Sequence, residues 1–320
     1  MRETGDGKLV SVLIPIHGAA PYLEKTIEGI RRQESVEIEL VVVLDRPTES
    51  LKIQTELLIA NFKKKKLLVS PGSGISEALN FGMNHCRGEY VARIDSDDEM
   101  LKDRLIKQKL FLDKNPIVSA VGTQIIKVSE DDRIIGQSRY PNNAFLLRKF
   151  LRIRNCIAHP SVMYRRDEVL RVGGYRTTFD GAEDYDLWVR LSRKGKIANL
   201  NECLTEYRIW NGQDTNRYKS DKNLRAYQVQ LFSELEEVAP EYATGLISKQ
   251  LSKEQLSEAA EDFLRAHAAL RWRRLRSIFK LNEALNQRKQ MLYTSLLTVV
   301  LSCIFKIGSL SLLIKFTGNR

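Results

Sequence analysis

The sequence predicts an α/β fold, a mostly parallel sheet flanked by helices. Three observations lead to this class: short and nearly continuous apolar runs, amphipathic helical segments, and a regular alternation of the two up to about residue 113. Nearly continuous apolar runs are typical of strands buried on both faces. Strands that alternate with helices indicate parallel pairing, with helices on both sides of the sheet.

The predicted strands are Leu9–Ile16, Ile38–Leu44, Lys66–Val69 and Glu89–Ile94. The helices that follow them are predicted at Pro21–Gln33, Glu49–Phe62, Gly74–Cys86 and Leu101–Asp113. The segment Gly72-Ser73-Gly74 looks like part of a dinucleotide-binding fingerprint, but the third position is Glu77 instead of glycine. We therefore predict a tight turn there.

Beyond residue 115 the pattern is less regular. It predicts a strand at Pro160–Tyr164, a helix at Tyr185–Lys194 and an extended segment at Lys196–Ile209. From about Asp221 onward the pattern is largely helical. We expect one domain over residues 1–215 and a helical, basic C-terminal extension over residues 216–320.

The chain has 320 residues and a formal net charge of +11, which favours an anionic partner such as a nucleotide, a membrane surface or a nucleic acid. Part of the excess lies between Phe263 and Gln290, which contain eight Lys or Arg and one acid. No zinc-finger, RNP or helix-turn-helix pattern accompanies these residues, which argues against nucleic acid.

Polar clusters follow three of the predicted strands. They are His17-Gly18, Asp45-Arg46 and the segment Asp95–Asp98. Ligands of open α/β sheets bind outside the carboxyl ends of the strands, so these clusters are expected to share one binding edge. Clustered carboxylates repel one another unless a cation compensates, which favours a divalent metal. A solvated loop is the alternative interpretation, and Asp98 is equally compatible with capping the next helix.

Six segments, in this order, resemble the successive motifs of family 2 glycosyltransferases. They are VSVLIPIHGAAPYLEKTIEGIRRQ, ELVVVLDRPTE, GISEALNFGMNHCRGEYVARIDSDDEMLKDRLIKQ, HPSVMYRRDEVLRVGGY, GAEDYDLWVRL and YRIWNGQDT, spread over roughly residues 8–215. The resemblance implies a GT-A fold, a nucleotide-sugar donor with UDP-sugars favoured, a divalent cation and inversion at the anomeric carbon.

Asp95 and Asp97 match the family's DxD motif, which implies that they hold Mg²⁺ or Mn²⁺ against the donor diphosphate. Asp184 stands at the place of the family's catalytic base, which takes a proton from the acceptor hydroxyl. An alternative is that Glu183, Asp184 and Asp186 only favour the start of a helix through its dipole, an interpretation that suits Asp186 best.

On the donor side, Asp45 matches the acid that binds the nucleobase, although the family more often has two adjacent acids there. Arg46 is a candidate contact to the donor phosphates. His17 replaces a tyrosine usual in the family; stacking on the nucleobase and a purely structural role are both open.

On the acceptor side we expect Glu183, His159 and Trp210, with a structural role also open for His159. Trp210 stands where many relatives have a histidine, and an indole cannot bind a metal. It is expected either to line the sugar site or to pack in the core. The QxxRW motif of processive synthases is absent, which favours transfer of a single sugar.

The C-terminal extension contains a basic aromatic segment at residues 271–280 and an apolar one at residues 291–316, interrupted by Lys306. This pattern fits an anchor on an anionic leaflet, and a terminal helix that covers the sheet is the alternative. The start of the chain has no apolar stretch typical of a signal peptide. We therefore expect a cytoplasmic protein, peripheral on the inner face of the cell membrane, with a glycan or polyprenyl-linked acceptor.

These observations favour a metal-dependent inverting glycosyltransferase of surface polysaccharide biosynthesis, such as that of O-antigen, capsule or exopolysaccharide. The alternatives are an inactive family member that acts as a binding partner, and a basic protein that binds membranes or nucleic acid. An active enzyme is favoured because the chain has all four of the family's acids, Asp45, Asp95, Asp97 and Asp184. The sequence has no P-loop, no GxSxG elbow and no HExxH motif, which argues against the corresponding classes of hydrolase and ATPase.

Overall fold

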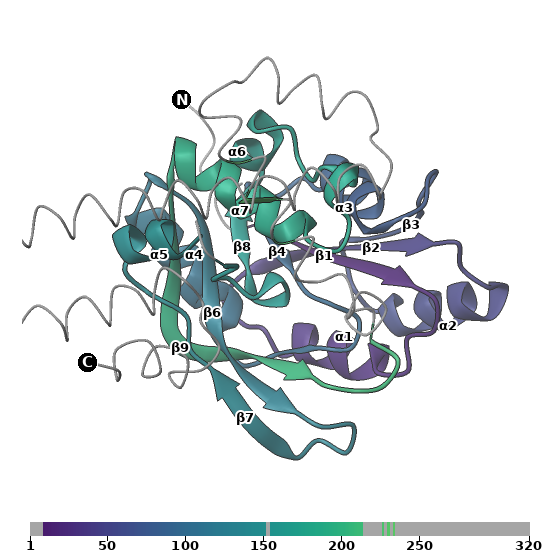
Figure 1. Cartoon of the computed structure of the whole chain (residues 1–320). Coiled ribbons are helices and arrows are strands. Elements are labelled where there is room, and N and C mark those ends of the chain that lie inside the picture. The colour runs from purple at the N-terminus through teal and green to yellow at the C-terminus, as the bar shows by residue number, and fades with distance from the viewer. Residues whose placement is uncertain (1–8, 152–153, 214–225, 227–228, 231–232, 234–320) are drawn as a thin grey trace, which may run out of the picture. The chain divides into compact units, whose positions relative to one another are not determined.

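The computed structural model describes residues 9–151 and 154–213, together with 226, 229–230 and 233 (Figure 1). The strands are β1 Leu9–His17, β2 Glu37–Asp45, β3 Lys65–Val69, β4 Tyr90–Arg93, β5 Glu99–Met100, β6 Val118–Val128, β7 Ile134–Ser138, β8 Met163–Arg165 and β9 Lys196–Arg208. The helices are α1 Leu23–Arg31, α2 Glu49–Ile59, α3 Ile75–His85, α4 Arg104–Lys114, α5 Ala144–Leu151, α6 Arg166–Arg171 and α7 Glu183–Lys194, and the 3₁₀ turns are η1 His159–Ser161 and η2 Thr177–Phe179.

The strands form one sheet in the order β3-β2-β1-β4-β8-β6-β9-β5, and β7 pairs with β6. Strands β3, β2, β1, β4, β6 and β9 run in one direction, whereas β8, β5 and β7 run in the other. The sheet is therefore mostly parallel, as predicted. Each of the first four predicted strands agrees with the structure to within one residue at either end.

Both faces of β1 are buried because helices cover both sides of the sheet. Val12 packs in one apolar cluster with Ile27 of α1 and with residues of α2 and α4. On the opposite face, Gly82 of α3 lies so close that an added Cβ would be 2.4 Å from Leu13 and 2.7 Å from Val43. Close packing of α3 on β1 and β2 therefore requires a residue without a side chain at this position.

The sequence does not predict the β6–β7 hairpin, β5, α5 or α6. Strand β6 is almost wholly buried, but its apolar pattern is interrupted by polar residues that bond within the fold. Thr123 donates to the Gln124 carbonyl at 2.9 Å, and the Gln124 amide donates to the Leu200 carbonyl at 2.7 Å. Buried polar side chains with internal partners make a core strand look like a loop in the sequence.

The prediction of a strand at Pro160–Tyr164 is wrong in its first part. Residues His159–Ser161 form the turn η1, and the strand β8 begins only at Met163. Proline fixes its φ angle and lacks an N–H, so Pro160 suits the start of a 3₁₀ turn better than the interior of a strand. The prediction at Lys196–Ile209 is confirmed by β9.

A buried ion cluster holds α7 against the preceding loop. Asp186, which is 2% exposed, accepts hydrogen bonds from the Arg190 Nε and Nη2 atoms at 3.0 and 2.7 Å. It also accepts one from Arg176 Nε at 3.0 Å. The carboxylate therefore joins two guanidinium groups, which is a more specific role than the helix-dipole effect that the sequence suggests.

We expect Asp186→Asn to lower the free energy of unfolding by about 3–5 kcal/mol, because two partly buried guanidinium groups would lose their carboxylate. Urea denaturation measures this change. The matched control is Asp167→Asn, which removes an exposed acid from the first turn of α6 and should change stability by less than about 0.5 kcal/mol. Equal denaturation midpoints for the two variants would contradict the role given to the cluster.

The expected C-terminal extension at residues 216–320 lies outside the described residues, apart from the few named above, and so do the segments 271–280 and 291–316. The division at residue 215 therefore stays a prediction. Within the described part of the chain, no helix has the length and apolar character needed to cross a bilayer.

Candidate active site

The ends of β1 and β2 bring His17 and Asp45 together, since the two residues are register partners in the parallel pair. His17 Nδ1 lies 2.9 Å from Asp45 Oδ2, and the Gly74 N–H donates to the same oxygen at 3.1 Å. Gly74 has a φ of 105°, a conformation that favours glycine, where the chain bends just before α3. Arg46 Nε lies 3.3 Å from the other oxygen, so the 3%-exposed Asp45 carboxylate is held by three donors.

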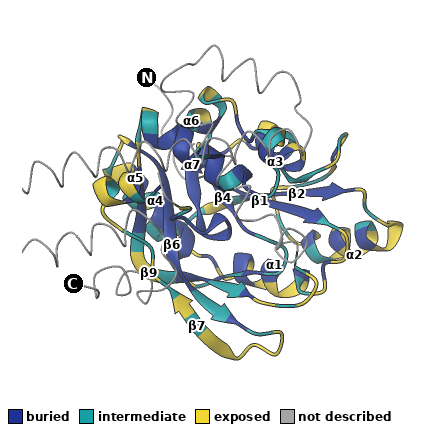
Figure 2. Cartoon of the chain, viewed as in Figure 1, coloured by how far each residue is buried: buried dark blue, intermediate teal, exposed yellow. Residues whose placement is uncertain are grey.

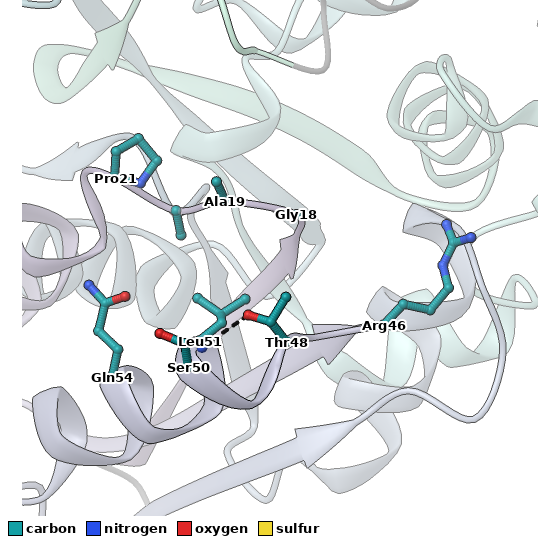
Figure 3. Close-up of a pocket in the computed structure, with 9 residues that line it drawn as sticks. Gly18, Ala19, Pro21, Arg46, Thr48, Ser50, Leu51 and Gln54 are labelled. Atoms are coloured by element: carbon teal, nitrogen blue, oxygen red, sulfur yellow. Dashed lines mark hydrogen bonds between the residues drawn. The ribbon is translucent and has the colours of Figure 1, made fainter.

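A pocket of about 370 Å³ lies beside this pair (Figure 3). It is lined by Gly18, Ala19, Ala20, Pro21, Arg46, Thr48, Ser50, Leu51 and Gln54. Thr48 caps α2 by accepting a hydrogen bond from the Leu51 N–H at 3.2 Å, and the Arg46 side chain extends to one side of the pocket. The volume is in the range of small-molecule sites.

The acidic loop after β4 gathers three carboxylates. Ligand atoms of Asp95, Asp97 and Asp98 all lie within 4.8 Å of one another. Burial and the neighbouring Asp95 raise the pKa of Asp97 to about 6. Burial, Asp97 and Asp95 together raise the pKa of Asp98 well above its usual value. The cluster thus concentrates negative charge in a partly buried place, and its oxygen donors suit Mg²⁺ or Mn²⁺.

Asp98 does not cap the following helix, because α4 begins at Arg104 with Asp103 in the N-cap position. Instead, its Oδ1 atom accepts a hydrogen bond from the Arg208 N–H at 2.8 Å. Its Oδ2 atom is buried and has no hydrogen-bond partner among the described residues. A buried oxygen of this kind fits a cation in the cluster, since an unpaired buried acceptor is costly.

Arg93, the last residue of β4, compensates part of this charge. It is 3% exposed and both of its terminal nitrogens pair with the Asp95 carboxylate. A fork-like guanidinium contact of this kind fixes the orientation of a carboxylate. Arg93 therefore fixes the orientation of Asp95 at the start of the acidic loop.

Trp210 lies beside the acidic loop and not in the apolar core. Its indole N–H donates to Asp97 Oδ2 at 2.6 Å, and its ring meets Tyr22 edge-on with 5.5 Å between centroids. Gln213 Nε2 lies 3.5 Å from the same Asp97 oxygen. An indole cannot bind a metal, but it can orient a carboxylate that does.

We expect Trp210→Phe to weaken binding of Mn²⁺ with a nucleoside diphosphate by about 10- to 100-fold, the usual cost of losing a residue that orients a metal ligand. The substitution keeps an aromatic ring next to Tyr22 and removes only the N–H donor. Isothermal titration calorimetry measures the change. An affinity equal to that of the unaltered protein would show that the bond to Asp97 has no role in binding.

The first turn of α7 carries two adjacent carboxylates in different surroundings. Asp184 is half-buried; its Oδ2 atom accepts a hydrogen bond from Asn155 Nδ2 at 2.7 Å and its Oδ1 atom accepts one from the Tyr185 N–H at 2.6 Å. Glu183 is buried, and the Gly181 N–H donates to it at 2.7 Å. Burial and the neighbouring Asp184 raise the pKa of Glu183 to about 8. Asp184 is thus the more accessible carboxylate of the two.

His159 lies beneath this turn, in the interior. Its Nε2 atom is 3.0 Å from the Tyr175 hydroxyl and its Nδ1 atom is 3.8 Å from Glu183 Oε1. Burial and the nearby Arg93 lower the pKa of His159 well below its usual value, so the ring is neutral. This geometry favours support of Glu183 over direct contact with an acceptor.

The pKa of Glu183 predicts a fall in stability with pH. Its folded-state pKa of about 8 exceeds the ordinary value of 4.5, so the folded state binds more protons between these values. The free energy of unfolding is expected to fall as pH rises from about 5 to about 8, by more than about 1 kcal/mol from this group. Glu183→Gln should be less sensitive to pH over this window. Urea denaturation at the two pH values tests this, and identical pH dependence in both proteins would contradict it.

Arg93 and Asn155 are candidate site residues that the sequence reasoning does not identify. Both support a carboxylate from a distant or neighbouring segment, Asp95 in one case and Asp184 in the other. A charged residue inside the predicted strand Glu89–Ile94 is the one signal in the sequence that points to Arg93. No comparable signal exists for Asn155, because its partner is 29 positions away along the chain.

Comparison with known proteins finds similar glycosyltransferases. The chain is 33% identical to the O-antigen biosynthesis glycosyltransferase WbnJ of Escherichia coli, over 63% of this chain and 80% of that protein. It is 30% identical to the amylovoran biosynthesis glycosyltransferase AmsE of Erwinia amylovora, over 70% of this chain and 84% of that protein.

Solved structures share the fold at low identity. The S. aureus TarS 1–349 complex with UDP-GlcNAc matches with a TM-score of 0.57 and 18% identity, over 71% of this chain and 66% of that chain. The mannosyltransferase PcManGT of Pyrobaculum calidifontis, in complex with GDP-Man and Mn²⁺, matches with a TM-score of 0.53 and 17% identity, over 93% of this chain and 87% of that chain. These neighbours establish the predicted GT-A fold.

The sequence profile described as "Glycosyl transferase family 2" matches residues 11–173, which contain β1 from its third residue onward, β2, β4 and the acidic loop. The family predicted from the six motifs is therefore confirmed, and the comparisons give no support to a nucleic-acid-binding protein. The chain belongs to glycosyltransferase family 2.

Proposed function

We propose that this protein is a metal-dependent inverting glycosyltransferase that adds one sugar to a glycan or polyprenyl-linked acceptor in surface polysaccharide biosynthesis. The observation that carries the proposal is the carboxylate cluster of Asp95, Asp97 and Asp98 at the edge where the parallel strands end. WbnJ, AmsE and the putative teichuronic acid glycosyltransferase TuaG of Bacillus subtilis support the biosynthetic role by their names.

The donor is a nucleotide-sugar, with UDP-sugars favoured. Asp45 is the acceptor for the nucleobase, and its bonds to His17 and the Gly74 N–H orient it for that task. Arg46 lines the neighbouring pocket and supplies positive charge near the donor phosphates. Structures of TarS with UDP-GlcNAc and UDP support this donor class, and the GDP-Man complex of PcManGT supports it more broadly.

Asp95 and Asp97 would hold Mg²⁺ or Mn²⁺, which stabilises the negative charge of the departing nucleoside diphosphate. Arg93 orients Asp95 and Trp210 orients Asp97, so both carboxylates have a supporting side chain. The buried Asp98 anchors the acidic loop to β9 through the Arg208 N–H. Fixed ligands reduce the reorganisation needed when donor binds.

Asp184 is the general base in this proposal. It accepts the proton of the acceptor hydroxyl while that oxygen bonds to C1 of the sugar and the bond from C1 to the diphosphate oxygen breaks. The leaving diphosphate takes the electron pair, and attack from the opposite side inverts the anomeric carbon. Asn155 and the Tyr185 N–H orient the base. Glu183 and His159 support the first turn of α7 on the acceptor side.

We place the protein at the inner face of the cell membrane as a peripheral enzyme. A lipid-linked acceptor would be presented there, and the basic segment 271–280 and the apolar segment 291–316 are suited to an anionic leaflet. The net charge of +11 supports the same location.

A transfer assay tests the proposed function. The protein is incubated with Mn²⁺, a bacterial lipid extract and radiolabelled UDP-, GDP- or dTDP-sugars, and label in the lipid fraction is counted. We expect incorporation from one donor, loss of incorporation with EDTA, and release of the matching nucleoside diphosphate. Release of no diphosphate from any donor would contradict the proposal.

A further inference from the structure

Helix α5 exposes large apolar side chains that the proposed reaction does not use. Phe145 is 65% exposed and Leu146 is 47% exposed, whereas Leu147 and Leu151 of the same helix are buried. Figure 2 shows α5 among the exposed parts of the fold. One side of the helix thus holds it to the core, and the other side presents a phenyl ring and a leucine to the surroundings.

The same surface is basic. Arg148 and Lys149 of α5 are exposed, and so is Arg154 just beyond it. Lys149 Nζ lies 4.3 Å from the centroid of the Phe145 ring, so the cationic and apolar groups share one surface. In the described part of the chain, none of these three cations forms an ion pair with a carboxylate. Residues 133–166 contain eight Lys or Arg and no Asp or Glu.

Exposed apolar side chains next to exposed cations favour one class of binding partner for α5. A protein partner or a second copy would have to match the exposed charges of Arg148, Lys149 and Arg154 with acids, and residues 133–166 offer none for a self-complementary contact. An anionic bilayer supplies negative charge at its surface and an apolar layer directly below it. Exposed Phe and Leu next to Lys and Arg match both layers.

The position of α5 connects this surface to the reaction. The Tyr185 hydroxyl of α7 donates to the carbonyl of Leu151, the last residue of α5, at 2.6 Å. Four residues further along, Asn155 donates to Asp184 at 2.7 Å. The C-terminal end of α5 is therefore tied to the turn that carries the candidate base.

We propose that the exposed face of α5, made of Phe145, Leu146, Arg148 and Lys149, docks on an anionic lipid bilayer. This proposal rests on the proposed function, because it explains how a lipid-linked acceptor would be delivered next to Asp184. It does not depend on residues 271–280 or 291–316. Contacts of separate segments with a bilayer add in free energy, so loss of the α5 contact lowers partitioning whatever the other segments contribute.

The test measures partition coefficients of the full-length protein on vesicles by flotation at limiting lipid. Vesicles contain phosphatidylcholine alone or with phosphatidylglycerol. We expect Phe145→Ser with Leu146→Ser to lower partitioning on phosphatidylglycerol vesicles by about tenfold or more. The matched control is Ile53→Ser with Leu57→Ser, which removes two similarly exposed apolar residues (52% and 72%) from α2 and should have no effect.

A second pair of variants tests the electrostatic part. Arg148→Gln with Lys149→Gln should lower partitioning about tenfold or more on phosphatidylglycerol vesicles and little on phosphatidylcholine alone. Lys63→Gln with Lys64→Gln is the control, because it removes the same net charge from the exposed loop between α2 and β3. Equal losses in the two pairs would show a general charge effect and overturn the assignment to α5.

Two further results would overturn the proposal. One is unchanged partitioning of the Phe145 and Leu146 double variant. The other is concentration-dependent dimerisation, measured by sedimentation velocity, that this variant abolishes, because α5 would then contact a second copy. Thermal stabilisation by nucleotide is measured in parallel on every variant. Absence of stabilisation by nucleotide would count against the proposed function. Unchanged partitioning of a variant that still binds nucleotide would count only against the membrane contact of α5.

Discussion

Asp184→Asn is expected to lower sugar transfer by about 10²- to 10⁴-fold and to leave donor binding unchanged. The amide is nearly the same size as the carboxylate, and its one oxygen can still accept a hydrogen bond from either Asn155 Nδ2 or the Tyr185 N–H. It cannot accept a proton from the attacking hydroxyl. Initial rates of nucleoside diphosphate release with acceptor present measure the loss, and calorimetry with the donor measures binding.

The control for this experiment is Asp167→Asn, which alters an exposed acid in the first turn of α6 that pairs with Arg166. It should transfer sugar at the normal rate. A second comparison, Glu183→Gln, separates the two neighbours, because Glu183 already carries a proton near neutral pH and its replacement should cost less activity. Near-normal turnover by Asp184→Asn would refute the base assignment.

Asp97→Asn should weaken metal-dependent binding of the nucleotide by more than about 100-fold. Loss of a direct ligand is expected to exceed the about 10- to 100-fold that loss of a supporting residue costs. The substitution also removes a charge from a crowded cluster, in which burial and Asp95 raise the pKa of Asp97 to about 6. The variant protein should therefore be at least as stable as the unaltered one, which separates lost binding from lost folding.

Titration calorimetry of UDP in the presence of Mn²⁺ gives the affinity, and repetition with EDTA gives the part that depends on metal. Asp103→Asn is the control, since Asp103 lies six residues along the chain with a φ of 64°, a conformation that asparagine tolerates. Retention of metal-dependent affinity in Asp97→Asn would show that the metal, where it binds, is held by other residues.

The first half of the fold could be predicted because the apolar residues of its strands and helices follow regular patterns. Strands such as Leu9–His17 are buried on both faces and are therefore nearly all apolar, and the helices between them have a clear apolar face. Strand ends also placed His17 and Asp45 at one edge, and the structure joins them at 2.9 Å. Parallel pairing with short connections leaves little choice of arrangement.

The second half could not be predicted in the same way. In β6, the buried Gln124 side chain donates to the main-chain carbonyls of Leu200 and Tyr140, and those partners are unknown before the strands are paired. Trp210 and Asp97 are 113 positions apart, and only the pairing of β5 with β9 explains why the indole reaches that carboxylate. Local patterns carry no information about such contacts.

The most direct test of the central claim, a metal-dependent nucleotide-sugar site at Asp95 and Asp97, is the thermal stability of the protein with UDP, dTDP, GDP and CMP, each with and without Mn²⁺. A ligand at a hundred times its Kd adds about 2.7 kcal/mol to the stability of the folded state. We predict a rise in Tm with one diphosphate, only in the presence of metal, that Asp97→Asn abolishes. Equal Tm values under all conditions would contradict the claim and favour a family member that has lost its activity.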